Sequence, residues 1–143
     1  LADIRIMGDG KYRYSFSEVS VGLTIQTIVL YQVETEIGRR GLVEVCMLGE
    51  AYQPAAALAV GLVDRVVRHD RALEEAVKYA RSLCDYPQKS LRSAKKALRA
   101  PLVAQFAALQ RGDLEEFRSL LSGNFEEGLR AVKERRRPHF KNP

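Results

Sequence analysis

The two cysteines and two histidines of the sequence could bind a metal or take part in nucleophilic catalysis, and their spacing decides whether they can do so. They are Cys46, Cys84, His69 and His139. Neither histidine has a carboxylate or cysteine at ligand spacing, so neither a zinc site nor a catalytic triad is predicted. Each cysteine lies among apolar residues of a helical pattern. We therefore expect two buried free thiols and a reducing, cytoplasmic setting.

Basic residues are the other group able to bind a ligand, and they are concentrated in the second half. The 143-residue chain has a net charge of +5. Residues 1–66 carry 6 Lys/Arg and 8 Asp/Glu, a net charge of −2, whereas residues 67–143 carry 17 and 10, a net charge of +7. Either an anionic ligand or a solvated surface would account for this asymmetry. Nucleic acid is not expected as a partner, because the aromatic residues are scattered rather than interleaved with the basic tail.

The elements that must position these residues begin with two short β-prone runs. Residues 3–7 and 12–16 flank the turn Gly8 to Lys11, which predicts a hairpin or a tight strand reversal. Apolar residues then recur at steps of three and four over 24–37, which predicts a helix that ends at Gly38. Three more elements are predicted in this half: a helix over 39–48, a helix over 54–61 and a strand over 62–67.

The remainder of the chain is helical in character. Pro87, Pro101 and the Ser122 to Asn124 turn separate its helices. The predicted helices cover residues 71–84, 87–99, 101–121 and 124–135. The longest unbroken apolar run, Ala55 to Val63, is far shorter than the roughly 20 residues that a membrane-spanning helix needs. No association with a membrane is expected.

Three predicted strands cannot complete a sheet, because their unpaired edges would be exposed and few apolar faces would be covered. The chain also opens without a methionine or a signal peptide, in residues that have the pattern of a strand already in progress. We therefore expect the missing strands to come from elsewhere, with this chain as part of a longer protein.

Seven segments, in their order and spacing, resemble the second half of a crotonase, the enoyl-CoA hydratase/isomerase superfamily. They are Asp3 to Ile6, Phe16 to Leu23, Ile37 to Arg39, Met47 to Glu50, Ala59 to Val67, Gly128, and Glu134 to Phe140. The resemblance implies an α/β fold in which residues 1–67 are the C-terminal part of a ββα spiral. Residues 68–143 would then be a helical region that builds a trimer, or a hexamer from two trimers, and lies near coenzyme A.

The resemblance also implies a catalytic group. Glu18 matches the second acid/base glutamate of the family, whereas the first glutamate and the oxyanion-hole amides would precede Leu1. Hydration of an unsaturated thioester needs a base for water, an acid for the α-carbon and donors for the enolate oxygen. Without the resemblance, Glu18 would be read as a solvent-facing turn residue.

Residues around and after Glu18 would contact the substrate: Val21, Gly22, Leu23 and Ile25. The sequence departs from the family here, because family hydratases have several glycines after the position of Gly22, whereas residues 23–37 contain no glycine or proline. Bulky residues would fill space in front of the acyl group. Ile25 at helical spacing is also typical of plain core, and we favour that interpretation.

At the C-terminal end, the family places an aromatic residue and a lysine near the adenine of coenzyme A, and Val132 and Arg135 match those positions. The aromatic ring is lost and the charge is kept. Arg135, Arg136, Arg137 and Lys141 could attract phosphates within about 8 to 10 Å. A solvated helix end favoured by the helix dipole is an equal alternative.

The resemblance thus implies an enoyl-CoA hydratase-type enzyme whose partner is an acyl-CoA thioester. It needs no separate cofactor, since coenzyme A is part of the substrate. Enoyl-CoA isomerase, decarboxylase and thioester hydrolase activities are open alternatives, as is a non-catalytic acyl-CoA-binding or assembly fragment. The fragment alone is expected to be inactive.

Overall fold

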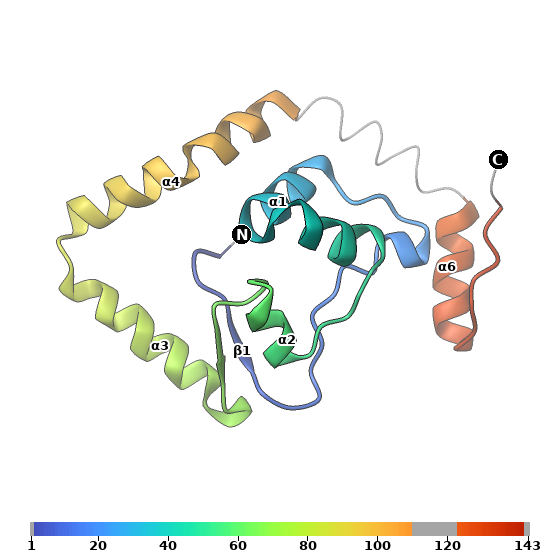
Figure 1. The fold of residues 1–143 in the computed structure, drawn as a ribbon, viewed down its shortest axis with the longest axis horizontal. Coiled ribbons are helices and arrows are strands. Elements are labelled where there is room, and N and C mark those ends of the chain that lie inside the picture. Colours follow the sequence, from blue (N-terminus) through green and yellow to red (C-terminus); the bar gives the residue numbers. More distant parts are fainter. Residues whose placement is uncertain (1, 110–122, 142–143) are drawn as a thin grey trace. The chain divides into compact units, whose positions relative to one another are not determined.

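The computed structural model describes residues 2–109 and 123–141 (Figure 1). The chain divides into two compact units. Unit 1 comprises Leu1–Tyr14 and Tyr52–Ala104, and unit 2 comprises Ser15–Ala51 and Gln105–Pro143. The sequence-based boundary near residue 67 separates a catalytic core from an assembly region and stays a prediction.

Unit 1 is built on a parallel strand pair, β1 (Ile6–Gly8) and β2 (Arg65–Val67). The register pairs Ile6 with Arg65 and Gly8 with Val67. Between the two strands in sequence lies the short helix α2 (Pro54–Ala59), which begins with a proline at its first position. Its buried residues, with those that lead into β2, form the core of this unit: Pro54, Ala57, Leu62 and Val63.

The predicted hairpin is wrong, because the chain after β1 pairs with β2 instead of folding back. The Asp9 amide donates to the Val67 carbonyl at 2.7 Å, and the Asp9 carboxylate accepts from the His69 amide at 2.8 Å. The run over 12–16 makes only an isolated antiparallel bridge, between Tyr14 and Tyr52. A turn signal is local, whereas the partner of β1 lies far along the sequence.

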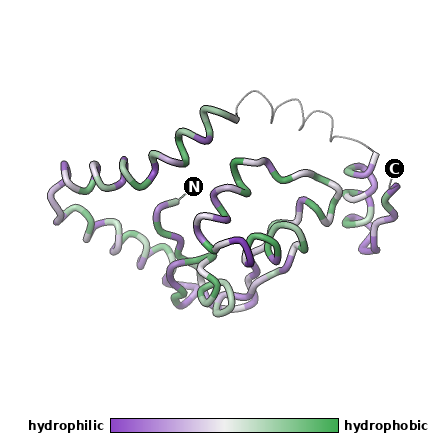
Figure 2. The backbone as a smooth tube through the Cα atoms, turned by 45° about the horizontal axis from the view of Figure 1, so that its top comes forward, coloured by the Kyte–Doolittle hydropathy of each residue, from purple (hydrophilic) through white to green (hydrophobic). Residues whose placement is uncertain are grey.

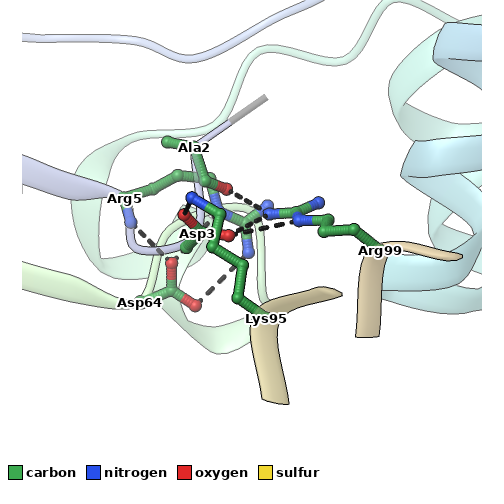
Figure 3. Close-up of polar contacts among 6 residues, drawn as sticks. All are labelled: Ala2, Asp3, Arg5, Asp64, Lys95 and Arg99. Carbon is green, nitrogen blue, oxygen red and sulfur yellow. Dashed lines mark hydrogen bonds and ion pairs between the residues drawn. The ribbon is translucent and has the colours of Figure 1, made fainter. Parts of the chain in front are cut away.

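Two ion clusters join distant segments of unit 1 (Figure 3). Asp3 pairs with Lys95 at 2.6 Å and with Arg99 at 3.1 Å, and the hydrogen bond from Lys95 is the main cause that lowers the pKa of Asp3. Asp64 accepts from the Arg5 amide at 2.7 Å and from its guanidinium at 3.1 Å. The guanidinium bond is the main cause that lowers the pKa of Asp64. These clusters tie the segment before β1 to helix α4 (Gln88–Leu109) and to the start of β2.

The helices of this unit follow β2. A 3-10 turn, η3 (His69–Arg71), leads into α3 (Ala72–Ser82), and a second 3-10 turn, η4 (Leu83–Asp85), ends it. The helix α4 (Gln88–Leu109) then begins in unit 1 and contains Pro101. Figure 2 shows hydrophilic positions interrupting α4 along its length. No helix of the described residues combines the length and the hydropathy that crossing a membrane requires.

Two predictions for these helices are wrong. The helix continues through Pro101, because the freed carbonyl of Ala97 lies on an exposed stretch where water can satisfy it. Cys84 is exposed, because it lies in the turn η4, where the helical periodicity that predicted its burial no longer holds. The part of the predicted helix beyond Leu109 lies outside the described residues.

Unit 2 contains helix α1 (Thr27–Leu42), the π-helical turn η2 (Val43–Met47), the 3-10 turn η1 (Val19–Val21) and helix α6 (Gly123–Glu134). The predicted break at Gly38 is present as a kink, with φ of 71° and ψ of 172° inside α1. The buried apolar residues of this unit are Ile25, Val33, Val45, Cys46 and Ala131. One member of this core, Cys46, interacts electrostatically with Glu18.

Candidate active site

Glu18 stands at the start of η1, and its backbone carbonyl closes the turn. That carbonyl accepts the amide of Leu23 at 2.8 Å and the amide of Val21 at 3.1 Å. Gly22 ends the turn with φ of 74°, a left-handed conformation that favours glycine. The local backbone therefore fixes the direction from which the Glu18 side chain leaves the chain.

The Glu18 carboxylate has one oxygen that is buried but makes no hydrogen bond to the described residues. The residue is half-buried, and its Oε2 atom is sealed from solvent with no hydrogen-bond partner among the described residues. A buried acceptor without a partner costs about 1 to 3 kcal/mol, so such atoms are rare unless they serve a ligand, a water or a proton transfer. This unmet acceptor makes Glu18 the candidate acid/base group of the unit.

Cys46 of η2 lies near enough to Glu18 to respond to its charge. Its side chain is fully buried, and burial is the main cause that raises the pKa of the thiol, with the negative charge of Glu18 adding to it. A thiol whose pKa is raised stays protonated at neutral pH and is a poor nucleophile. Glu18, rather than Cys46, is therefore the acid/base candidate of this pair.

Helix α6 supports the turn that carries Glu18 through two glycine contacts. A Cβ atom added at Gly128 would overlap the Val21 carbonyl oxygen, and one added at Gly22 would lie 2.8 Å from the backbone of Asn124. No other residue type allows the two backbones to approach so closely. The position of η1 is thus set by α6.

The chain after α6 folds back along the helix and is fastened to it at two points (Figure 1). Near the start of α6, the Asn124 side chain donates to the Lys141 carbonyl at 3.1 Å and accepts from the Lys141 amide at 2.9 Å. One turn further, both Glu127 oxygens accept from the Arg136 guanidinium, at 2.5 and 3.0 Å, and Oε1 also accepts from the His139 amide at 2.9 Å. We call residues 135–141 the C-terminal tail.

The Arg136 guanidinium is the main cause that lowers the pKa of Glu127, to about 2, and the His139 amide adds to it. The same pairing raises the pKa of Arg136. Two oxygens bonded to a planar two-pronged donor form the strong, charge-assisted type of ion pair. Nothing in the sequence indicated it, because a separation of nine residues matches no helical spacing.

The structure places the four predicted substrate-binding residues in two settings. Val21, Gly22 and Leu23 are half-buried on and directly after η1, close in sequence to Glu18. Ile25 is 6% exposed and belongs to the core of the unit, the location that the sequence favoured. Their contact with a substrate stays a prediction.

The predicted coenzyme-A residues lie at the other end of α6. Val132 is 63% exposed, and Arg135, just past the helix, is exposed with φ of 53°. Of the neighbouring arginines, Arg136 is bonded to Glu127 and Glu134, whereas Arg135 and Arg137 have no ion-pair partner within residues 2–109 and 123–141. These three arginines therefore divide into one that is held in ion pairs and two that lack an ion-pair partner among the described residues.

Comparisons with known proteins give a family-level result. A family profile described as enoyl-CoA hydratase/isomerase matches residues 1–143. One similar protein, from Thermus thermophilus and named as an enoyl-CoA hydratase, is 29% identical over 144 residues, which cover 96% of this chain and 54% of that protein. Another, the mitochondrial enoyl-CoA delta isomerase 1 of Rattus norvegicus, is 29% identical over 121 residues, which cover 84% of this chain and 42% of that protein. The chain spans about half the length of the curated relatives it matches.

Solved structures agree on the fold. The crystal structure of an enoyl-CoA hydratase from Mycobacterium avium subsp. paratuberculosis superimposes with a TM-score of 0.86 at 25% identity. The superposition covers 98% of this chain and 57% of that one.

Proposed function

The chain belongs to the enoyl-CoA hydratase/isomerase family and has an α/β crotonase fold, and on this premise we propose that it is part of an enzyme that acts on an acyl-CoA thioester. Its place is the C-terminal part of that enzyme, with Glu18 as an acid/base group at the reacting carbons. The observation that carries the proposal is the sealed Oε2 atom of Glu18, which has no hydrogen-bond partner in the part of the chain that the structure describes.

The reaction proposed first is hydration of a 2-enoyl-CoA. A base removes a proton from water, the resulting hydroxide adds to C3, and the electron pair moves onto the thioester oxygen as an enolate. An acid then returns a proton to C2, so that one water is added in total. A carboxylate can serve as the base or, once protonated, as the acid. The donors for the enolate oxygen and the second acid/base group belong to the family half that precedes Glu18.

Isomerisation of an enoyl-CoA is the second candidate, because relatives named for hydratase and for isomerase activity match this chain at the same 29% identity. Moving a double bond from C3 to C2 requires a base that takes a proton from C2 and returns it to C4. One carboxylate can perform both transfers, whereas hydration is better served by two groups.

Substrate contacts follow from the same proposal. Val21, Gly22 and Leu23 line the acyl side of the site, and coenzyme A, as part of the substrate, takes the place of any separate cofactor. Val132 and Arg135 lie toward its nucleotide end, where the free guanidinium attracts phosphates. The helices after residue 67 assemble the protein as a homotrimer or as a hexamer.

The test uses the natural full-length protein and two substrates. Loss of enoyl absorbance with crotonyl-CoA reports hydration, and gain of that absorbance with a 3-enoyl-CoA reports isomerisation. We expect Glu18→Gln to lower kcat by about 10²- to 10⁴-fold on the substrate that is turned over. Glu34→Gln is the matched control, because Glu34 is an exposed carboxylate on α1 of the same unit.

A wild-type rate in Glu18→Gln would remove Glu18 from the site. Binding of both acyl-CoA substrates without turnover of either would favour the non-catalytic alternative.

A further inference from the structure

We propose that Glu127 is a positioning residue for Glu18, an inference that rests on the proposed function. Its ion pair with Arg136 holds the C-terminal tail on α6, and α6 is the surface that fixes the turn carrying Glu18. Glu127 thereby influences proton transfer without contacting the substrate.

The first link is the connection between Glu127 and the tail. The side chain of Glu127 is only 16% exposed, and that of Arg136 is 33% exposed. Three donors reach the carboxylate, two from the guanidinium and one from the His139 backbone. Partial burial protects such a pair from screening by salt, so it holds the tail more firmly than a surface pair would.

The second link runs from the helix to η1. Gly128 follows Glu127 directly and is buried against the Val21 carbonyl, with no room even for a methyl group. Val21 in turn donates its amide to the Glu18 carbonyl. Because protein interiors are packed without slack, a shift of α6 by a fraction of an ångström passes to the turn.

The third link is at the other glycine contact. Gly22 lies against the backbone of Asn124, whose side chain exchanges two hydrogen bonds with Lys141 at the far end of the tail. The tail is therefore bonded to α6 at Asn124 and at Glu127. These positions coincide with, or directly precede, the residues through which α6 contacts η1, Asn124 and Gly128. Loosening the tail at Glu127 removes the stronger of these two attachments.

The proposal predicts coupling between Glu127 and Glu18, which a double-mutant cycle on the natural full-length protein measures. We expect Glu127→Gln to lower kcat about tenfold in the wild-type background, because small misplacements of a reacting group are costly. In the Glu18→Gln background the same change should leave the residual rate unaltered. A merely structural role would lower the rate by the same factor in both backgrounds.

Glu134→Gln is the matched control. Glu134 lies on the same helix and pairs with the same arginine, but its side chain is 50% exposed and it makes no bond to the tail backbone. We expect this variant to keep the wild-type kcat in both backgrounds.

A second measurement keeps the proposal testable if Glu127→Gln is destabilised. Hydrogen exchange of the Val21 and Leu23 amides should become faster in Glu127→Gln and in the milder Arg136→Lys, and stay unchanged in Glu134→Gln.

An unchanged kcat in Glu127→Gln, alongside an impaired Glu18→Gln, would overturn this inference alone. Equal losses in both backgrounds, or unchanged exchange of the two amides, would also overturn it. A wild-type rate in Glu18→Gln would overturn the proposed function, and the exchange result would still report whether the tail holds the turn.

Discussion

The two units of the chain use the same arginine–carboxylate chemistry in different surroundings. In unit 1, Asp3 is 48% exposed where it pairs with Lys95 and Arg99, and both of its partners face solvent to some degree. In unit 2, Glu127 is 16% exposed where it pairs with Arg136 and a backbone amide. The Asp64 side chain of unit 1 is 35% exposed, a value between those of Asp3 and Glu127. Exposure therefore ranks three carboxylates, Asp3, Asp64 and Glu127, that each pair with a basic side chain.

This difference in exposure decides how much an ion pair contributes to the structure around it. An exposed pair is weakened by water and salt and contributes about 0 to 1 kcal/mol. A sheltered carboxylate must be satisfied by several donors, so its removal disturbs every segment that supplies one. In unit 2 those segments include the C-terminal tail, which is bonded to α6, the helix that supports the Glu18 turn.

The largest loss of stability is expected at Gly128 of α6, whose contact with Val21 positions the turn η1 in unit 2. Gly128→Ala should lower the free energy of unfolding by about 3 kcal/mol, because a methyl group would overlap the Val21 carbonyl. Urea unfolding measures the change. Gly123→Ala is the control, since no described residue other than its own helix neighbours lies within 4 Å of a Cβ at that position of the same helix. An equal loss in Gly123→Ala would show that the contact with the Val21 carbonyl is not responsible, because alanine has the higher helix propensity and should by itself stabilise the helix.

The next effect is the pH dependence of the Glu127 pair. The pKa of Glu127 in the folded protein is about 2, below its ordinary value of 4.5, so its contribution to stability is complete above that ordinary value. As the pH falls from about 4.5 to about 2, the unfolded chain takes up the proton first and the contribution is lost.

Thermal midpoints measured by circular dichroism at pH values on both sides of this window check that expectation. The difference between the wild type and Glu127→Gln should be largest near neutrality and small at about pH 2. A constant difference would contradict the pairing of Glu127 in the folded state.

A smaller effect is expected for Asp64→Asn in unit 1. The variant loses the charge-assisted bonds from Arg5, while its amide oxygen can still accept the backbone amide. We expect a loss of about 1 kcal/mol in urea unfolding. A loss as large as that of Gly128→Ala would show that this pair, despite its exposure, anchors the strand pair of the unit.

The smallest effect is expected for Asp3→Asn. Its ion pairs with Lys95 and Arg99 are exposed, so the loss should stay below about 0.5 kcal/mol and disappear in high salt. Urea unfolding at low and at high ionic strength measures it. A loss that persists in high salt would show that the Asp3 ion pairs resist screening, as we expect of the sheltered Glu127 pair and not of a surface pair.

Elements with strong local signals could be predicted from the sequence. Helices α2, α3 and α6 fall within two residues of their predicted bounds, because a proline at the first position, a regular apolar face or a capping turn marks each of them. The parallel pairing of β1 with β2 could not be predicted, since its register depends on residues almost sixty positions away.

The candidate site was predictable only in part. Glu18 entered through resemblance, and its sealed oxygen is a property of the folded chain alone. The partners Glu127 and Arg136 meet because the chain reverses after α6, and no periodicity encodes a reversal. Cys46 likewise faces Glu18 through tertiary packing, from a separate segment of the chain.

The two cysteines differ in exposure, and this difference makes one of them suitable for selective labelling. Cys46 is sealed with a thiol that resists ionisation, whereas Cys84 is exposed in unit 1. Because alkylating reagents need access and a thiolate, a maleimide dye added under native conditions should modify Cys84 and spare Cys46. Of the two cysteines of this chain, Cys84 can thus carry a fluorophore without mutation, and modification of Cys46 becomes a direct signal of unfolding in unit 2.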